Sequence, residues 1–140
     1  MKMLGFLVAI AALVFTLPAD AASVVAKISL SNQRMYVSVN GVPKYTWAVS
    51  TARPGYRTPT GTFRPQWLHR MHYSSKYENA PMPHSVFFYG GYAIHGTNAV
   101  GSLGRPVSHG CVRLAPGNAA TLYSLVSKYG MGNTRVTITR

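Results

Sequence analysis

Hydrophobic and polar residues alternate along most of the chain after residue 22, as they do in half-buried β-strands. Strands are predicted over residues 25–30, 35–39 and 44–49, near Phe63, and over 86–89, 92–94 and 136–138. Asn40-Gly41 lies between two of these segments and predicts a tight hairpin turn, because both residues tolerate a positive φ. The pattern therefore predicts a mainly β domain.

Two segments depart from the alternation. The apolar residues Leu122, Leu125, Val126 and Tyr129 follow the helical period. Pro116 suits the first turn and Gly130 the end, so one short C-terminal helix is expected over residues 116–129. Residues 66–84 are aromatic, rich in histidine and without periodicity. They are expected to form a long surface loop over a binding site.

The first residues resemble a secretory signal. Lys2 precedes an apolar run from Leu4 to Leu17, and Ala19-Asp20-Ala21 is a small-x-small cleavage site. A membrane anchor is the alternative, but the run is short for a bilayer span of about 20 residues. We expect a signal peptide over residues 1–21, a single catalytic domain over residues 23–140, and export to the periplasm or cell-wall space without a stable membrane span.

The charge is strongly one-sided. The chain has 14 Lys and Arg against 2 Asp and Glu, a net charge of +12, and loss of Lys2 and Asp20 with the signal leaves that value unchanged. Such a chain is attracted to polyanions, and export favours the carboxylate-rich envelope over nucleic acid. Solubility or loose surface adhesion is the alternative explanation. Since Glu78 is the only acid left, two-carboxylate glycosidase chemistry and an aspartate-containing triad are excluded.

The chain has 1 cysteine, Cys111, within the run Ser108-His-Gly-Cys-Val-Arg-Leu114. A lone thiol is buried packing, a link to another chain or a nucleophile. His109 and Arg113 flank it, and cationic neighbours lower a thiol pKa. The run therefore predicts a reactive thiolate.

His95, which ends a predicted strand before Gly96, is the favoured base for this thiol. His109 is the competitor and is assigned a structural or substrate-side role. A zinc site using His69, His72 and Cys111 is the alternative, but no CxxC, HExxH or acidic ligand accompanies it. No metal or cofactor is expected.

The runs Tyr92-Ala-Ile-His-Gly-Thr97 and Ser108-His-Gly-Cys-Val-Arg-Leu114 together resemble the catalytic block of the L,D-transpeptidases, the YkuD domain family. Residues 57–63, Arg-Thr-Pro-Thr-Gly-Thr-Phe, match upstream, so the similarity covers nearly all of the predicted domain. The resemblance implies a β-sandwich-like catalytic fold. It also implies that Cys111 is the nucleophile, His95 its base and the Gly96 carbonyl the third member.

The resemblance further implies that the Gly110 and Cys111 N–H groups bind the oxyanion, with Ser108, His109 and Arg113 shaping the site. Candidate substrate-binding residues are Tyr92, Arg70 and Lys76. The implied partners are peptidoglycan stem peptides, with a second stem, an envelope lipoprotein, a D-amino acid or water as acceptor. A monomer without nucleic acid is expected.

Two alternatives remain: a cysteine hydrolase of the cell wall, of the L,D-carboxypeptidase or amidase type, and a non-catalytic cationic envelope-binding protein. Papain-like and NlpC/P60-like peptidases place Cys before His, whereas His95 precedes Cys111 here. Sortases share the His, Cys, Arg order, but their Thr-Leu-x-Thr-Cys run is missing.

Overall fold

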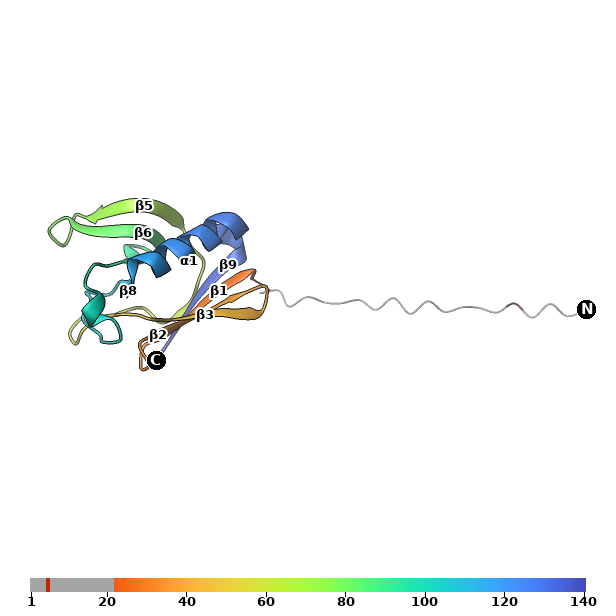
Figure 1. Cartoon of the computed structure of the whole chain (residues 1–140), viewed down its shortest axis with the longest axis horizontal. Coiled ribbons are helices and arrows are strands. Elements are labelled where there is room, and N and C mark those ends of the chain that lie inside the picture. Colours follow the sequence, from red (N-terminus) through yellow and green to blue (C-terminus); the bar gives the residue numbers. More distant parts are fainter. Residues whose placement is uncertain (1–4, 6–21) are drawn as a thin grey trace, which may run out of the picture.

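The computed structural model describes residue 5 and residues 22–140, so the expected signal peptide lies outside the described part of the chain. Within that part, two β-sheets pack around a shared core together with a single α-helix (Figure 1). No helix among the described residues is both long enough and apolar enough to cross a membrane. The mainly β architecture predicted from the alternation is confirmed.

The first sheet contains five strands in the order β3-β2-β1-β9-β4. Their bounds are β1 Val24–Ser29, β2 Arg34–Val39, β3 Val42–Ala48, β4 Gly61–Phe63 and β9 Thr134–Thr139. Asn40 and Gly41 both have positive φ, 50° and 78°, so the predicted hairpin turn between β2 and β3 is confirmed. Strand β9 lies between β1, to which it is parallel, and β4, to which it is antiparallel.

The second sheet has the order β5-β6-β7-β8. Its strands are β5 Trp67–Ser74, β6 Ala80–Tyr89, β7 Tyr92–Gly96 and β8 Val112–Leu114. β7 and β8 pair in parallel; His95 lies on β7, and Cys111 directly precedes β8.

The expectation of an irregular loop over residues 66–84 is wrong, because this segment forms the β5–β6 hairpin. Two prolines in β6, Pro81 and Pro83, conceal the strand in the sequence, since proline is normally kept out of paired strands. β5 is also an edge strand with mostly exposed or half-buried side chains, so it lacks a clear alternation. The hairpin turns through Glu78 and Asn79, which both have positive φ, and it projects from the rest of the sheet (Figure 1).

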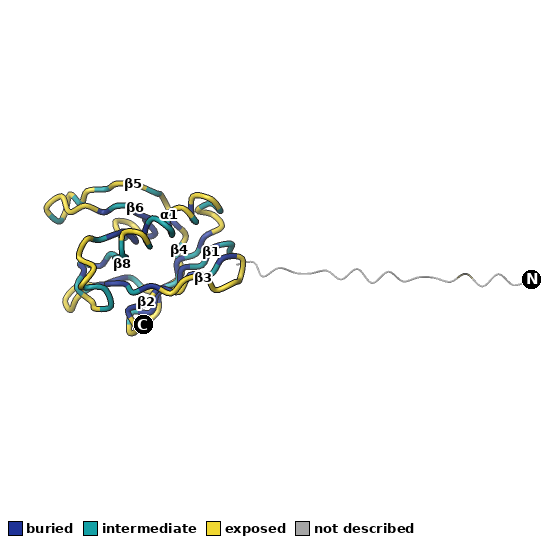
Figure 2. The backbone as a smooth tube through the Cα atoms, in the orientation of Figure 1, coloured by how far each residue is buried: buried dark blue, intermediate teal, exposed yellow. Residues whose placement is uncertain are grey.

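The core lies between the two sheets, and Figure 2 shows the buried backbone concentrated there. Helix α1, Pro116–Tyr129, contributes Ala119, Leu122 and Val126 to this core and packs against β6 and β7. Its bounds match the prediction from the helical period. Two short 3₁₀ segments, η1 Val100–Ser102 and η2 Met131–Asn133, complete the described elements.

Candidate active site

The pairing of β7 with β8 brings the two catalytic motifs side by side. His95 lies opposite Arg113 in the register, and Ile94 lies opposite Val112. Because side chains alternate across a strand, Cys111 and Arg113 share one face of the sheet with His95. Ile94 and Val112 point the other way, into the main core. The fold thus places a thiol, an imidazole and a guanidinium on one face.

The turn before Cys111 is held by two buried hydroxyl groups. Ser108 Oγ donates to the Cys111 carbonyl at 2.7 Å and accepts the Gly110 N–H at 3.0 Å. Thr58 Oγ1 donates to the Gly110 carbonyl at 2.8 Å and accepts the Ala52 N–H at 3.1 Å. Thr58 lies in the 57–63 run that carries the resemblance, but the sequence alone indicates no role for this residue. Since Ser108 already takes up the Gly110 N–H, that donor is not free for an oxyanion in this arrangement.

Gly110 is required in this turn by both conformation and space. Its φ is +135°, and an added Cβ would lie 2.7 Å from Tyr92 Cε1 and 2.9 Å from the Arg57 carbonyl oxygen. A backbone carbonyl cannot move aside cheaply, so any side chain here must displace the turn that carries Cys111.

We therefore expect Gly110→Ala to lower the free energy of unfolding by about 2 kcal/mol or more and to reduce Cys111 alkylation. Gly117→Ala is the matched control, because nothing lies within 4 Å of its added Cβ and alanine favours the helix. Urea unfolding of both variants measures the difference. Equal stability of the two would contradict this account of the turn.

His95 is buried and oriented by the neighbouring backbone. Its Nδ1 lies 2.7 Å from the Gly96 carbonyl oxygen. A carbonyl only accepts hydrogen bonds, so Nδ1 carries the proton and Nε2 of the neutral ring is left as the basic nitrogen. Gly96 itself is packed against Pro83, Ala119 and Pro116, which an added Cβ would approach within 3.2–3.4 Å. The carbonyl contact expected from the resemblance is therefore present, and tight packing fixes its position.

Burial decides the charge state of both groups. Burial lowers the pKa of His95 from 6.5 to about 4. The hydrogen bond to the Gly96 carbonyl raises this pKa, whereas the charges of Arg113 and His72 lower it further. Burial also raises the pKa of the Cys111 thiol, and this outweighs the Ala93 N–H and Arg113, which lower it. The expectation of a resting thiolate is wrong, because desolvation exceeds the effect of the single nearby guanidinium. At neutral pH the site holds a neutral thiol and a neutral imidazole.

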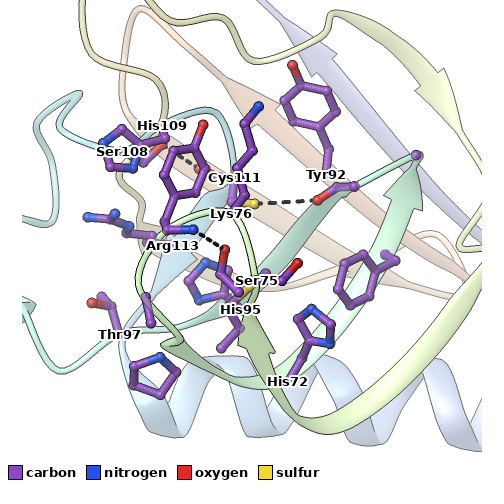
Figure 3. Close-up of a pocket in the computed structure, with 18 of the residues that line it drawn as sticks. His72, Ser75, Lys76, Tyr92, His95, Thr97, Ser108, His109, Cys111 and Arg113 are labelled. Carbon is purple, nitrogen blue, oxygen red and sulfur yellow. Dashed lines mark hydrogen bonds between the residues drawn. The ribbon is translucent and has the colours of Figure 1, made fainter.

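The thiol's position agrees with this state, since Cys111 Sγ lies 3.9 Å from the Gly91 carbonyl oxygen, an acceptor for an S–H donor (Figure 3). We expect the rate of Cys111 alkylation by iodoacetamide to rise through the alkaline range, with a midpoint above that of an exposed cysteine thiol, because burial raises the pKa of Cys111. The physical reason is that only the thiolate reacts. Rates measured from pH 5 to 10.5 by intact mass give this midpoint. A plateau already reached at pH 6 would indicate a thiolate–imidazolium pair instead.

Cys111 and His95 line one cavity of about 620 Å³ (Figure 3). Most of the residues predicted for the site border it as well: Tyr92, Ser108, His109, Arg113 and Lys76. Arg70 does not border the cavity and lies exposed on β5. Trp67, His72 and Phe87 pack against one another and form an aromatic wall of the cavity.

His109 takes a different place from His95. It is stacked on Tyr77, with ring centroids 4.2 Å apart, and it also contacts Tyr56 at 4.8 Å. Tyr77 belongs to the turn of the β5–β6 hairpin, so this stack joins the hairpin tip to the turn that carries Cys111. His109 therefore lines the cavity as part of this stack, and its structural or substrate-side role stays a prediction.

His69, His72 and Cys111, the residues of the zinc alternative, do not form a three-ligand group. His69 and His72 face each other, with their Nδ1 atoms 3.2 Å apart, and both pack on Trp67. Among the residues that the structure describes, no group of three His, Cys, Asp or Glu side chains is placed to hold a metal ion.

Comparison with known proteins identifies relatives of this arrangement. A family model for the YkuD L,D-transpeptidase catalytic domain matches residues 23–138. The YkuD protein of Bacillus subtilis is 28% identical over 117 residues, covering 81% of this chain and 64% of that protein. An L,D-transpeptidase from Mycobacterium smegmatis has 26% identity and a TM-score of 0.75, with coverage of 85% and 59%.

Two further solved structures are similar. The L,D-transpeptidase from Xylanimonas cellulosilytica has 28% identity and a TM-score of 0.69, covering 87% of this chain and 63% of that one. The LD transpeptidase LdtMt1, solved in complex with imipenem, has 25% identity and a TM-score of 0.75, with coverage of 84% and 59%. The chain spans about three fifths of the length of these relatives. The family match extends over nearly all of residues 22–140, and the chain belongs to the YkuD family of L,D-transpeptidase catalytic domains.

Proposed function

We propose that this chain is an exported peptidoglycan L,D-transpeptidase that uses Cys111 as its nucleophile. The observation that carries the proposal is the 2.7 Å contact between His95 Nδ1 and the Gly96 carbonyl, on the same sheet face as Cys111. This contact leaves Nε2 as a base beside the thiol without any carboxylate. The positive charge of the chain, +12, suits the carboxylate-rich wall as a substrate.

The first half of the reaction acylates the enzyme. His95 Nε2 takes the proton of the neutral Cys111 thiol as sulfur attacks the amide between the third, L-centred residue and D-alanine of a stem peptide. The new S–C bond forms a tetrahedral oxyanion, for which the Cys111 N–H is the proposed donor. The C–N bond then breaks, the proton passes from His95 to the leaving amine, and a thioester remains.

The second half transfers the acyl group. An amine of an acceptor, deprotonated by neutral His95, attacks the thioester and restores the thiol. A second stem peptide gives a crosslink, a lipoprotein amine gives attachment to the wall, a D-amino acid gives exchange, and water gives a carboxypeptidase. The low pKa of His95 suits this step, because the ring is unprotonated over the whole neutral range.

Incubation with purified disaccharide-tetrapeptide tests the proposal, with products identified by mass spectrometry. Release of D-alanine together with a crosslinked dimer is the expected result. Imipenem, which is bound in the similar LdtMt1 structure, is a second probe, and a single adduct at Cys111 is expected. A cationic envelope-binding protein would bind peptidoglycan but give neither product nor adduct, and this outcome would contradict the proposal.

A further inference from the structure

Among the residues that the structure describes, Arg113 is the arginine that lines the cavity with Cys111 and His95. It is half-buried. Its backbone is fully used, since the N–H and carbonyl both pair with Ser50. No hydrogen bond or ion pair to the Arg113 side chain is present among the described residues, so the head group faces the cavity without a protein partner.

The surroundings of this cation are also unusual, because they contain no compensating negative charge. Burial lowers the pKa of Arg113 and nearby Arg53 lowers it further; only a Cys111 thiolate opposes them. Glu78, the one acid of the described residues, is exposed in the β5–β6 turn. A half-buried cation with no anion beside it is costly, unless a ligand supplies the charge.

A second donor lies next to the guanidinium. Thr97 follows β7 two residues after His95, and its N–H bonds to the Leu114 carbonyl, beside Arg113. Thr97 also lines the cavity, on the side of Arg113 in Figure 3. Its Oγ1 accepts the Ala99 N–H at 3.1 Å, which leaves the hydroxyl proton free to donate. A guanidinium beside a hydroxyl donor matches the hydrogen-bonding pattern of a carboxylate.

The spacing indicates which carboxylate fits. Cys111 and Arg113 are two residues apart on an extended segment, so their Cα atoms are about 7 Å apart. A peptide that ends one residue beyond the attacked carbonyl carries its terminal carboxylate about 4 Å further along the chain. With the sulfur on the carbonyl carbon, that carboxylate is within reach of the long Arg113 side chain, which lines the same cavity.

We propose that Arg113, with the Thr97 hydroxyl, binds the free C-terminal carboxylate of the residue that leaves during acylation. The site then favours donors whose leaving residue has a free carboxylate over donors that lack it. This inference rests on the proposed function for the identity of the donor, but the anion site itself does not depend on it.

The first test compares two donor peptides without any acceptor. One is the tetrapeptide ending in D-alanine, and the other is the same peptide with a C-terminal amide. Charge-assisted hydrogen bonds predict that single-turnover acylation favours the acid by about 10- to 100-fold in the unmodified enzyme. In Arg113→Gln the preference should fall to within about threefold, and Arg113→Lys should keep part of it. Equal rates for the two donors in the unmodified enzyme would overturn the proposal, as would an undiminished preference in Arg113→Gln.

The second test needs no peptide chemistry. Iodoacetate and iodoacetamide alkylate the same Cys111 thiolate, so the ratio of their rates cancels any change in thiol pKa. We expect Arg113→Gln to lower the iodoacetate-to-iodoacetamide ratio about tenfold. Arg105→Gln removes the same charge from an exposed position outside the cavity and should leave the ratio unchanged. Equal iodoacetate-to-iodoacetamide ratios in Arg113→Gln and Arg105→Gln would contradict the proposed anion site. If the ratios differ while neither peptide is cleaved, the anion site stands and the transpeptidase proposal fails.

Discussion

Cys111→Ala is expected to remove D-alanine release and the imipenem adduct together, with turnover at least about 10³-fold below that of the unmodified protein. The reason is that the chain has 1 cysteine, so no other thiol can form the thioester. Measurements are product formation from disaccharide-tetrapeptide by mass spectrometry and intact mass after incubation with imipenem. A variant that still releases D-alanine would remove Cys111 from the mechanism.

The stability of Cys111→Ala is measured as the control, to show that the variant still folds. Cys111 packs against the small cluster of Met82, Phe87 and Ala93, so loss of sulfur costs little burial. We expect a loss of about 1 kcal/mol in the free energy of unfolding, which is a few degrees in Tm. Circular dichroism and thermal melting therefore separate a missing nucleophile from a misfolded turn. Cys111→Ser adds a second check, because it keeps the side-chain size and exchanges only the nucleophile.

The second large effect is expected for His95→Ala, which should slow acylation by at least about 100-fold, as expected for loss of a general base. His109→Ala should cost much less, because His109 lies between Tyr56 and Tyr77 at the edge of the cavity. Single-turnover acylation by tetrapeptide, measured for both variants, gives the ranking. The reverse order would show that His109 is the base.

Chemical rescue distinguishes loss of the base from collapse of the site. His95→Ala leaves a buried space beside Cys111, and added imidazole should restore part of the acylation rate there. The Gly96 carbonyl remains available to hold the added ring by its N–H group. Absence of rescue, together with normal iodoacetamide alkylation of Cys111, would assign His95 a structural role.

Periodicity was sufficient to predict most of this fold. The strands of the first sheet have one buried and one open face, so their alternation is visible in the sequence. The helix was equally visible, because one stripe of Pro116–Tyr129 is buried and its ends carry proline and glycine signals. The pairing of the two sheets was not predictable, since it depends on contacts between distant segments such as Ser50 with Arg113.

The site was only partly predictable for a related reason. The identity of Cys111 and His95 follows from residue chemistry, but their charge states follow from burial, which a linear sequence does not show. The Thr58 hydroxyl reaches the Gly110 carbonyl, and Trp67 reaches the cavity, only through the turn and strand geometry of their segments. These contacts depend on the three-dimensional fold, so a short sequence motif does not predict them.

The parallel pairing of β1 with β9 has a consequence for how this protein folds. The register joins Val24 to Thr134 and Ser29 to Thr139, so the interior of the first sheet closes only when the two ends of the domain meet. Contacts of such long sequence separation slow folding, because chain closure precedes the stabilising contacts. During synthesis the sheet therefore stays incomplete until β9 has emerged. Until then β4 has no neighbour in its sheet, because β9 is the strand that joins it to β1.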